Sequence, residues 1–147
     1  MTATNHAITG AFIATIIKQP LLAVPLAFLS HFVCDALPHF DVGFKFGDRR
    51  MFLYLMADGL AALVAAAFLL SQGVDNPVLL AVCGFAAMSP DLMWLYYGIK
   101  DGTHSKKESH GIVARFHSKI QWSTSTYGII PEMVWAFVLL SLIIKRN

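Results

Sequence analysis

The chain has 147 residues, of which 56 % are hydrophobic and 14 % are charged. With a mean hydropathy of +0.60, this composition excludes an ordinary soluble domain and predicts one polytopic membrane domain over residues 1–147. The net charge of +2 is too small to indicate a nucleic-acid partner. Cys34 and Cys83 both fall in apolar segments, so the sequence predicts neither a disulfide framework nor a cysteine metal pair.

The first forty residues predict two short helices. One begins at Thr4 or Asn5 and ends near Lys18, and the other covers residues 21–37 after a turn that contains Pro20. No basic residue precedes the first apolar run and no small-residue cleavage site follows it, so we expect this segment to stay in the mature protein. Both helices are short for a hydrocarbon core of about 30 Å. They either cross a thinned membrane or form a partly re-entrant hairpin.

The rest of the chain predicts longer apolar helices. Residues 51–71 are typical of a spanning helix, and residues 78–99 are apolar around a helix restart at Ser89 to Asp91. Residues 112–122 place apolar side chains at helical spacing, which indicates a helix on the membrane surface. Residues 129–144 form a last apolar helix. We therefore expect an all-α membrane bundle with four or five spanning helices and one interfacial amphipathic helix.

The second helix ends in residues that suggest metal chemistry. His31 and Asp35 are four residues apart, so on a helix they share one face, one turn apart. An imidazole and a carboxylate presented in this way can hold one metal ion between them. Ionisable groups are costly in hydrocarbon, which favours a functional interpretation. A structural buried pair is the alternative.

Other ionisable residues are expected at the same height in the membrane. His6 and His31 are about equally far from the turn at Pro20, and Asp58 and Asp91 are about equally far from the turn at 72–77. In a hairpin of antiparallel helices, the two residues of each pair would lie at the same depth in the membrane. Most of the 11 basic residues lie in the loops at the same end, and the positive-inside rule makes that end cytoplasmic.

Three more candidates, His39, Asp41 and His117, also fall toward this end. Each candidate has an ordinary alternative. The two residues after Pro38 can cap a turn or face solvent, and His117 can be an interfacial polar residue. Asp58 can pair with a nearby arginine, and a carboxylate such as Asp91 in a first helical turn is stabilised by the helix dipole.

The motifs together resemble those of the small inner-membrane metal-dependent hydrolase family. More remotely, they are similar to the zinc-dependent phospholipase C superfamily, whose all-helical core gathers His and Asp around a metal cluster. The shared motifs are an N-terminal His that opens an apolar helix, a His-x-x-x-Asp at a helix end, a Ser-Pro-Asp and a Phe-His-Ser. They span most of residues 6–118. The resemblance implies five metal ligands: His6, His31, Asp35, Asp91 and His117.

The sequence thus predicts a metal-dependent hydrolase of the inner (plasma) membrane that acts on a lipid or another amphiphilic (phospho)ester at the cytoplasmic leaflet. Zinc is the expected ion, with Mn or Fe as alternatives. His39 is a sixth candidate ligand, and Asp58 or Asp41 is a candidate general base. Candidate phosphate-binding residues on the same face are Arg49, Arg50, Arg115 and Lys119. A proton or metal-ion transporter and a non-catalytic scaffold with a structural metal site remain open, as does the oligomeric state.

Overall fold

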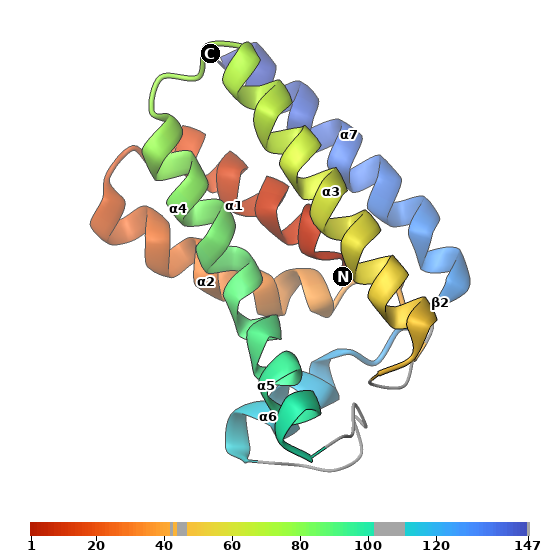
Figure 1. Ribbon diagram of the computed structural model, residues 1–147. Coiled ribbons are helices and arrows are strands. Elements are labelled where there is room, and N and C mark those ends of the chain that lie inside the picture. The colour runs from red at the N-terminus through yellow and green to blue at the C-terminus, as the bar shows by residue number, and fades with distance from the viewer. Residues whose placement is uncertain (42, 44–46, 102–110, 147) are drawn as a thin grey trace.

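The computed structural model describes residues 1–41, 43, 47–101 and 111–146. It confirms an all-α chain (Figure 1). In chain order the elements are α1 (Ala3–Ile16), α2 (Pro20–Asp35), β1 (His39–Phe40), α3 (Arg49–Ser71), α4 (Pro77–Met88), η1 (Ser89–Asp91), α5 (Leu92–Asp101), α6 (Ile112–Ile120), β2 (Thr124–Ser125), η2 (Thr126–Gly128) and α7 (Ile129–Arg146).

Within the described residues, three helical segments are long and apolar enough to cross a membrane: Arg49–Ser71, Pro77–Lys100 and Thr126–Arg146. The second of them joins α4, η1 and α5 into the nearly continuous green rod of Figure 1. The expected number of four or five also counted the two N-terminal helices. These have 14 and 16 residues, or about 21 and 24 Å at 1.5 Å per residue. Whether they span therefore stays a prediction.

Helix α1 lies at the centre of the bundle and packs against α2, α3, α4 and α7. Its contact with α4 depends on glycine. A Cβ atom on Gly10 would lie 2.2 Å from the carbonyl oxygen of Cys83, and one on Gly84 would lie 3.2 Å from that of Ala7. The two backbones therefore touch directly, and this close approach fixes the position of α1 relative to α4.

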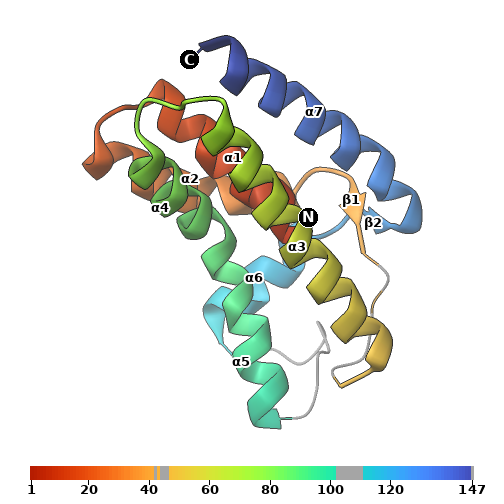
Figure 2. The same ribbon diagram turned by 45° about the horizontal axis from the view of Figure 1, so that its top comes forward.

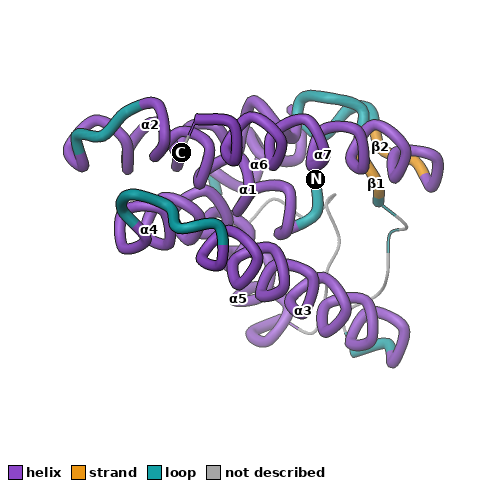
Figure 3. Tube along the Cα trace, turned by 90° about the horizontal axis from the view of Figure 1, so that it is seen from above, coloured by secondary structure: helices purple, strands orange, loops and turns teal. Residues whose placement is uncertain are grey.

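Helix α3 lies in front of the other helices in Figures 1 and 2 and at one edge of the bundle in the view from above (Figure 3). This helix is described throughout, and Leu69 is its single buried residue. Large apolar side chains such as Leu60 and Leu63 are 63 % and 69 % exposed. An apolar helix exposed in this way fits contact with lipid, because water would disfavour so large an apolar surface.

The two ends of the bundle differ in character. At one end, the Lys18 ammonium lies 2.8 Å from the Asp75 carboxylate in the α3–α4 turn, and Arg146 of α7 lines the same small hollow. The other end carries η1, α6 and the two-residue parallel strands, in which His39 pairs with Thr124. Gly128 lets η2 approach β1, since a Cβ there would lie 2.0 Å from the His39 carbonyl carbon.

Helix α6 presents its apolar residues outward, which is unusual for a small helix. Ile112 and Phe116 are 79 % and 52 % exposed, whereas Ala114 and His117 are buried. Figure 3 shows the bundle from above, with α6 behind the upper layer of helices. An outward apolar face supports the prediction of an interfacial helix. The inner face is left to Ala114 and His117.

Candidate metal centre

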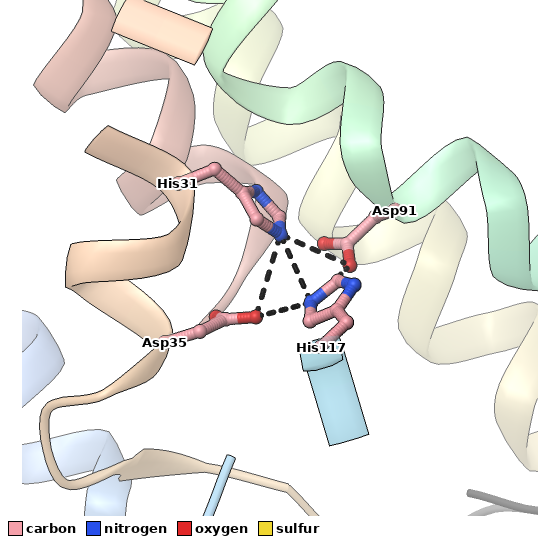
Figure 4. Close-up of side chains that lie close together, drawn as sticks. All are labelled: His31, Asp35, Asp91 and His117. Carbon is pink, nitrogen blue, oxygen red and sulfur yellow. Dashed lines mark hydrogen bonds and ion pairs between the residues drawn. The ribbon is translucent and has the colours of Figure 1, made fainter. Parts of the chain in front are cut away.

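Four side chains from three separate parts of the chain converge (Figure 4), at the end of the bundle that carries η1 and α6. His31 and Asp35 come from α2, Asp91 from η1 and His117 from α6. One ligand atom of each lies within 4.8 Å of the others. His31, Asp35 and His117 are fully buried, and the Asp91 side chain is 33 % exposed. The cluster therefore opens to its surroundings on the Asp91 side.

Local helix structure explains the positions of these four residues. His31 and Asp35 are one turn apart on α2, as the i, i+4 spacing predicts. Pro90 occupies the first turn after α4 and interrupts it, so Asp91 projects from a short 3₁₀ turn. His117 lies on the buried face of α6. The helix break at Pro90 thus supplies Asp91, and α6, whose apolar face points outward, supplies His117. These two residues complete the site with the His31–Asp35 pair.

The shortest contacts join the two histidine Nε2 atoms to one oxygen of Asp35. His117 Nε2 lies 2.6 Å from Asp35 Oδ2, His31 Nε2 lies 3.4 Å from the same atom, and the two Nε2 atoms are 3.1 Å apart. Asp91 Oδ1 is slightly farther away, 3.6 Å from His31 Nε2 and 3.7 Å from His117 Nε2. All four atoms face a common point.

The tautomer of His31 is fixed by the end of α4. Its Nδ1 donates to the carbonyl oxygen of Ala87 at 2.8 Å, so Nδ1 carries the proton and Nε2 presents a lone pair to the cluster. The last carbonyls of a helix have no partner within the helix, which leaves this acceptor free. A backbone acceptor behind a histidine is the usual means of orienting a metal-binding imidazole.

His6 lies on the other side of the two carboxylates. Its Nε2 is 3.1 Å from Asp35 Oδ1 and 4.0 Å from Asp91 Oδ2, which are the oxygens that face away from His31 and His117. The His6 ring stacks on His31 with centroids 4.0 Å apart, and its Nδ1 has no hydrogen-bond partner in the described ranges. The α-amino group of Met1 also contacts Asp35 Oδ1. Asp35 and Asp91 therefore each direct one oxygen toward His6 and the other toward His31 and His117.

Gln121 belongs to the same cluster and the sequence analysis missed it. Its Nε2 donates to Asp35 Oδ2 at 2.7 Å, while its Oε1 is buried and has no partner within the part of the chain that is described. Gln121 follows His117 by four residues, at the C-terminal end of α6. The same i, i+4 rule that linked His31 to Asp35 would have indicated it.

A second group of carboxylates anchors the N-terminus of α1. Buried Glu132 of α7 accepts hydrogen bonds from the Thr2 amide and hydroxyl, from Asn5 Nδ2 at 2.7 Å and from the Phe40 amide at 2.9 Å. Asp58 of α3 accepts from the amides of Ala3 and Thr4, at 2.8 and 3.1 Å, and from the Thr4 hydroxyl. We call these two carboxylates, Asp58 and Glu132, the α1 anchor. The sequence analysis did not identify Glu132.

The other candidate residues lie outside the cluster. His39 is buried in β1, donates from Nδ1 to the Leu37 carbonyl at 2.8 Å, and has its pKa lowered, chiefly by burial. Asp41 accepts from the amide of Gly43 at 2.8 Å, the pattern of a capped turn. The four candidate phosphate-binding cations are all exposed: Arg49, Arg50, Arg115 and Lys119.

The donor atoms of the cluster fit a divalent metal ion. Two imidazole nitrogens and two carboxylate oxygens, largely shielded from water, form a ligand set that suits Zn²⁺, and Mn²⁺ or Fe²⁺ use the same atoms. The two carboxylates would supply the negative charge. No protein-family profile, curated protein or solved structure matches this chain. The cluster itself is therefore the basis for any functional assignment.

Proposed function

We propose that the protein is a metal-dependent hydrolase of the membrane, acting on an amphiphilic phosphoester or acyl ester. The observation that carries this proposal is the convergence of His31, Asp35, Asp91 and His117, with ligand atoms within 4.8 Å of one another. Their identity also agrees with the resemblance to the small inner-membrane hydrolases. Zinc is the preferred ion. His6 and the outer oxygens of the two aspartates offer a position for a second one.

The residues around the ion have separate tasks. A bound Zn²⁺ would supply Lewis acidity, which polarises an ester or phosphoryl group and makes a water nucleophile available near neutral pH. Gln121 Nε2 donates to Asp35 Oδ2, and the Ala87 carbonyl orients His31 through its Nδ1. His117 Nε2 and Asp35 Oδ2, 2.6 Å apart, would both face the ion. Partly exposed Asp91 marks the side on which substrate can enter. The unpaired Oε1 of Gln121 can accept a hydrogen bond from a substrate hydroxyl or a water.

The general base and the phosphate-binding residues are less well supported. Asp58 already accepts from two backbone amides and a hydroxyl of α1, so it suits an anchor better than a base. Asp41 caps its own turn. The exposed arginines at the start of α3 and the cations of α6 can attract a lipid phosphate from the membrane surface. We place the site at the cytoplasmic leaflet of the inner membrane, because the loops at this end carry most of the basic residues.

The apolar core beyond the cluster supports hydrolysis over transport. A transporter needs polar groups that continue from the cluster through the bundle. Between the cluster and the end at Lys18, however, the described core is an apolar cluster that includes Ile8, Ala11, Ala23 and Ala27. A non-catalytic scaffold with a structural metal site would use the same ligands, so turnover must be measured directly.

The test uses the full chain purified in phospholipid nanodiscs, stripped with a chelator and reloaded with Zn²⁺. Metal content and hydrolysis of a fluorogenic amphiphilic phosphodiester and acyl ester are measured for the wild type, His31→Ala and Ser30→Ala. Ser30 is the matched control, since it neighbours His31 and its hydroxyl donates to the Ala27 carbonyl of its own helix. We expect His31→Ala to lose both metal and turnover and Ser30→Ala to keep both. Zinc binding by the wild type without hydrolysis of either substrate would overturn the proposal in favour of a scaffold.

A further inference from the structure

An apolar groove runs between α1, α3 and α4, apart from the polar cluster. It has a volume of about 300 Å³ and is lined entirely by Ala, Gly, Leu, Ile, Phe and Met residues. Helix α3 packs against α1 but makes little contact with α4, so the groove fills the space between the edge helix and the rest of the bundle. Two of its three walls, α3 and α4, belong to segments that can span a membrane.

Small side chains create the groove. Ala3, Ala7 and Ala11 lie along one face of α1 at i, i+4 spacing, and Ala62 and Ala66 face them from α3. Larger residues at these positions would close the space between the helices. The distance along α1 from Ala3 to Ala11 is about 12 Å. The groove is therefore narrow and elongated, the form that a hydrocarbon chain needs.

The lower end of the groove lies at the level of the metal centre. Met88 lines it and directly precedes η1, which carries Asp91. Ala3 also lines this end, and it lies three residues before His6 on α1. The upper end, at Ala11, Leu69 and Leu80, lies toward the α3–α4 turn. A molecule with its polar group at Asp91 would thus have an apolar channel beside it that runs into the membrane.

We propose that this groove binds one acyl chain of the substrate, which places the adjoining ester or phosphoester at the metal centre. This proposal rests on the proposed hydrolase function and narrows its substrate to lipids that carry such a chain. An acyl chain is favoured over a helix of a second copy because the groove is lined by apolar residues alone and ends beside the metal centre, at Ala3 and Met88. Its volume of about 300 Å³ lies at the lower limit of ligand pockets.

The test is photolabelling of the full chain in phosphatidylcholine and phosphatidylglycerol vesicles that contain a phospholipid with a diazirine at the end of one acyl chain. Labelled residues are mapped by mass spectrometry, with and without chelator. Ala3, Ala7 and Ala11 line the groove on α1, so label on these residues that the groove-filling variants lose reports a chain inside the groove. The proteins compared are the wild type, Ala62→Leu and Ala66→Leu, which fill the groove, and Ala61→Leu and Ala67→Leu, the same change at exposed positions of α3 that do not line it.

We expect labelling of α1 in the wild type, a loss of at least fivefold in the two groove variants, and no loss in the two controls. In the two groove variants, hydrolysis of the fluorogenic amphiphilic substrates should fall in parallel with the labelling, while the zinc content stays unchanged. Absence of label on α1, or label that Ala62→Leu leaves unchanged, would overturn the acyl-chain site. Labelling does not require metal or turnover, so labelled α1 without any hydrolysis would refute the hydrolase and leave the groove as a lipid site.

Discussion

The protein holds two sets of carboxylates within one bundle, and they are arranged in different ways. In the metal centre, the oxygens of Asp35 and Asp91 face imidazole nitrogens of His6, His31 and His117. In the α1 anchor, the oxygens of Asp58 and Glu132 face backbone amides, hydroxyls and a side-chain amide. The first set meets imidazole nitrogens that can share a metal ion, and Asp35 in addition accepts from Gln121 and contacts the Met1 α-amino group. The second meets donors that cannot give up their hydrogens.

This difference distinguishes a candidate metal-binding site from a set of hydrogen bonds that holds helices together. A carboxylate that accepts several N–H and O–H bonds has its lone pairs occupied, and leaving those donors unpaired would cost stability. A carboxylate that faces the Nε2 atoms of oriented histidines can instead turn toward a cation. The anchor also has a purpose for the site, since it holds the N-terminus of the helix that carries His6. The two sets should therefore respond differently to mutation.

The largest effect is expected from Asp35→Asn. Asp35 contacts His6, His31, His117 and Gln121, so its loss removes both a ligand charge and the group that aligns the others. We expect zinc affinity to fall about a thousandfold, or about 4 kcal/mol, which is the size expected when one charged partner leaves a buried group. Competition with a chelator of known affinity measures it. An affinity within tenfold of the wild type would place the ion elsewhere.

Glu132→Gln should break the anchor with less effect on the metal. The new amide places N–H groups against donors from Thr2, Asn5 or Phe40. We expect the free energy of unfolding to fall by about 2–3 kcal/mol, measured by chemical denaturation in detergent. The protein that remains folded should bind zinc to within about tenfold of the wild type. If folded Glu132→Gln protein instead loses zinc binding, the α1 anchor and the metal centre are not independent of each other.

Asp58→Asn should have a smaller effect. The asparagine oxygen can still accept from the amide of Ala3 or Thr4, as asparagine does at helix N-termini. We expect a loss of about 1 kcal/mol in unfolding free energy, with zinc content and turnover close to wild type. A general base contributes about 10²–10⁴-fold in rate. A drop of that size in zinc-loaded Asp58→Asn would restore the catalytic role that the sequence suggested for Asp58.

The smallest effect is expected at the opposite end of the bundle. The Lys18 ammonium lowers the pKa of the exposed Asp75 carboxyl by a hydrogen bond and by its charge. A lowered folded-state pKa stabilises the fold above the ordinary aspartate value of 3.8 and ceases to do so as the pH falls through the folded value. Lys18→Gln should therefore differ only slightly from wild type in unfolding free energy at pH 7 and not at all in acid. A large difference at pH 7 would contradict the view that this ion pair is a surface contact.

Much of this arrangement follows from sequence spacing. The i, i+4 rule places His31 beside Asp35, and equal distances from the turn at Pro20 place His6 level with His31. Equal distances from the turn at 72–77 also predicted Asp58 and Asp91 at the same height in the membrane. Height, however, does not determine the direction in which a side chain points around its helix. Asp58 therefore points to the N-terminus of α1. Glu132 could not be assigned from the sequence, because its partners lie about 130 residues away, at Thr2, and only the packing of α7 against α1 brings them together.

The most direct test of the metal centre is X-ray absorption spectroscopy on the zinc-loaded full chain. Cys34 is buried next to Asp35 in the sequence, so a sulfur ligand is a real alternative. The account predicts nitrogen and oxygen ligands at about 2.0–2.2 Å with imidazole scattering beyond them. His117→Ala should reduce that imidazole signal. Sulfur scattering at about 2.3 Å, or zinc content far below one ion per chain, would contradict it.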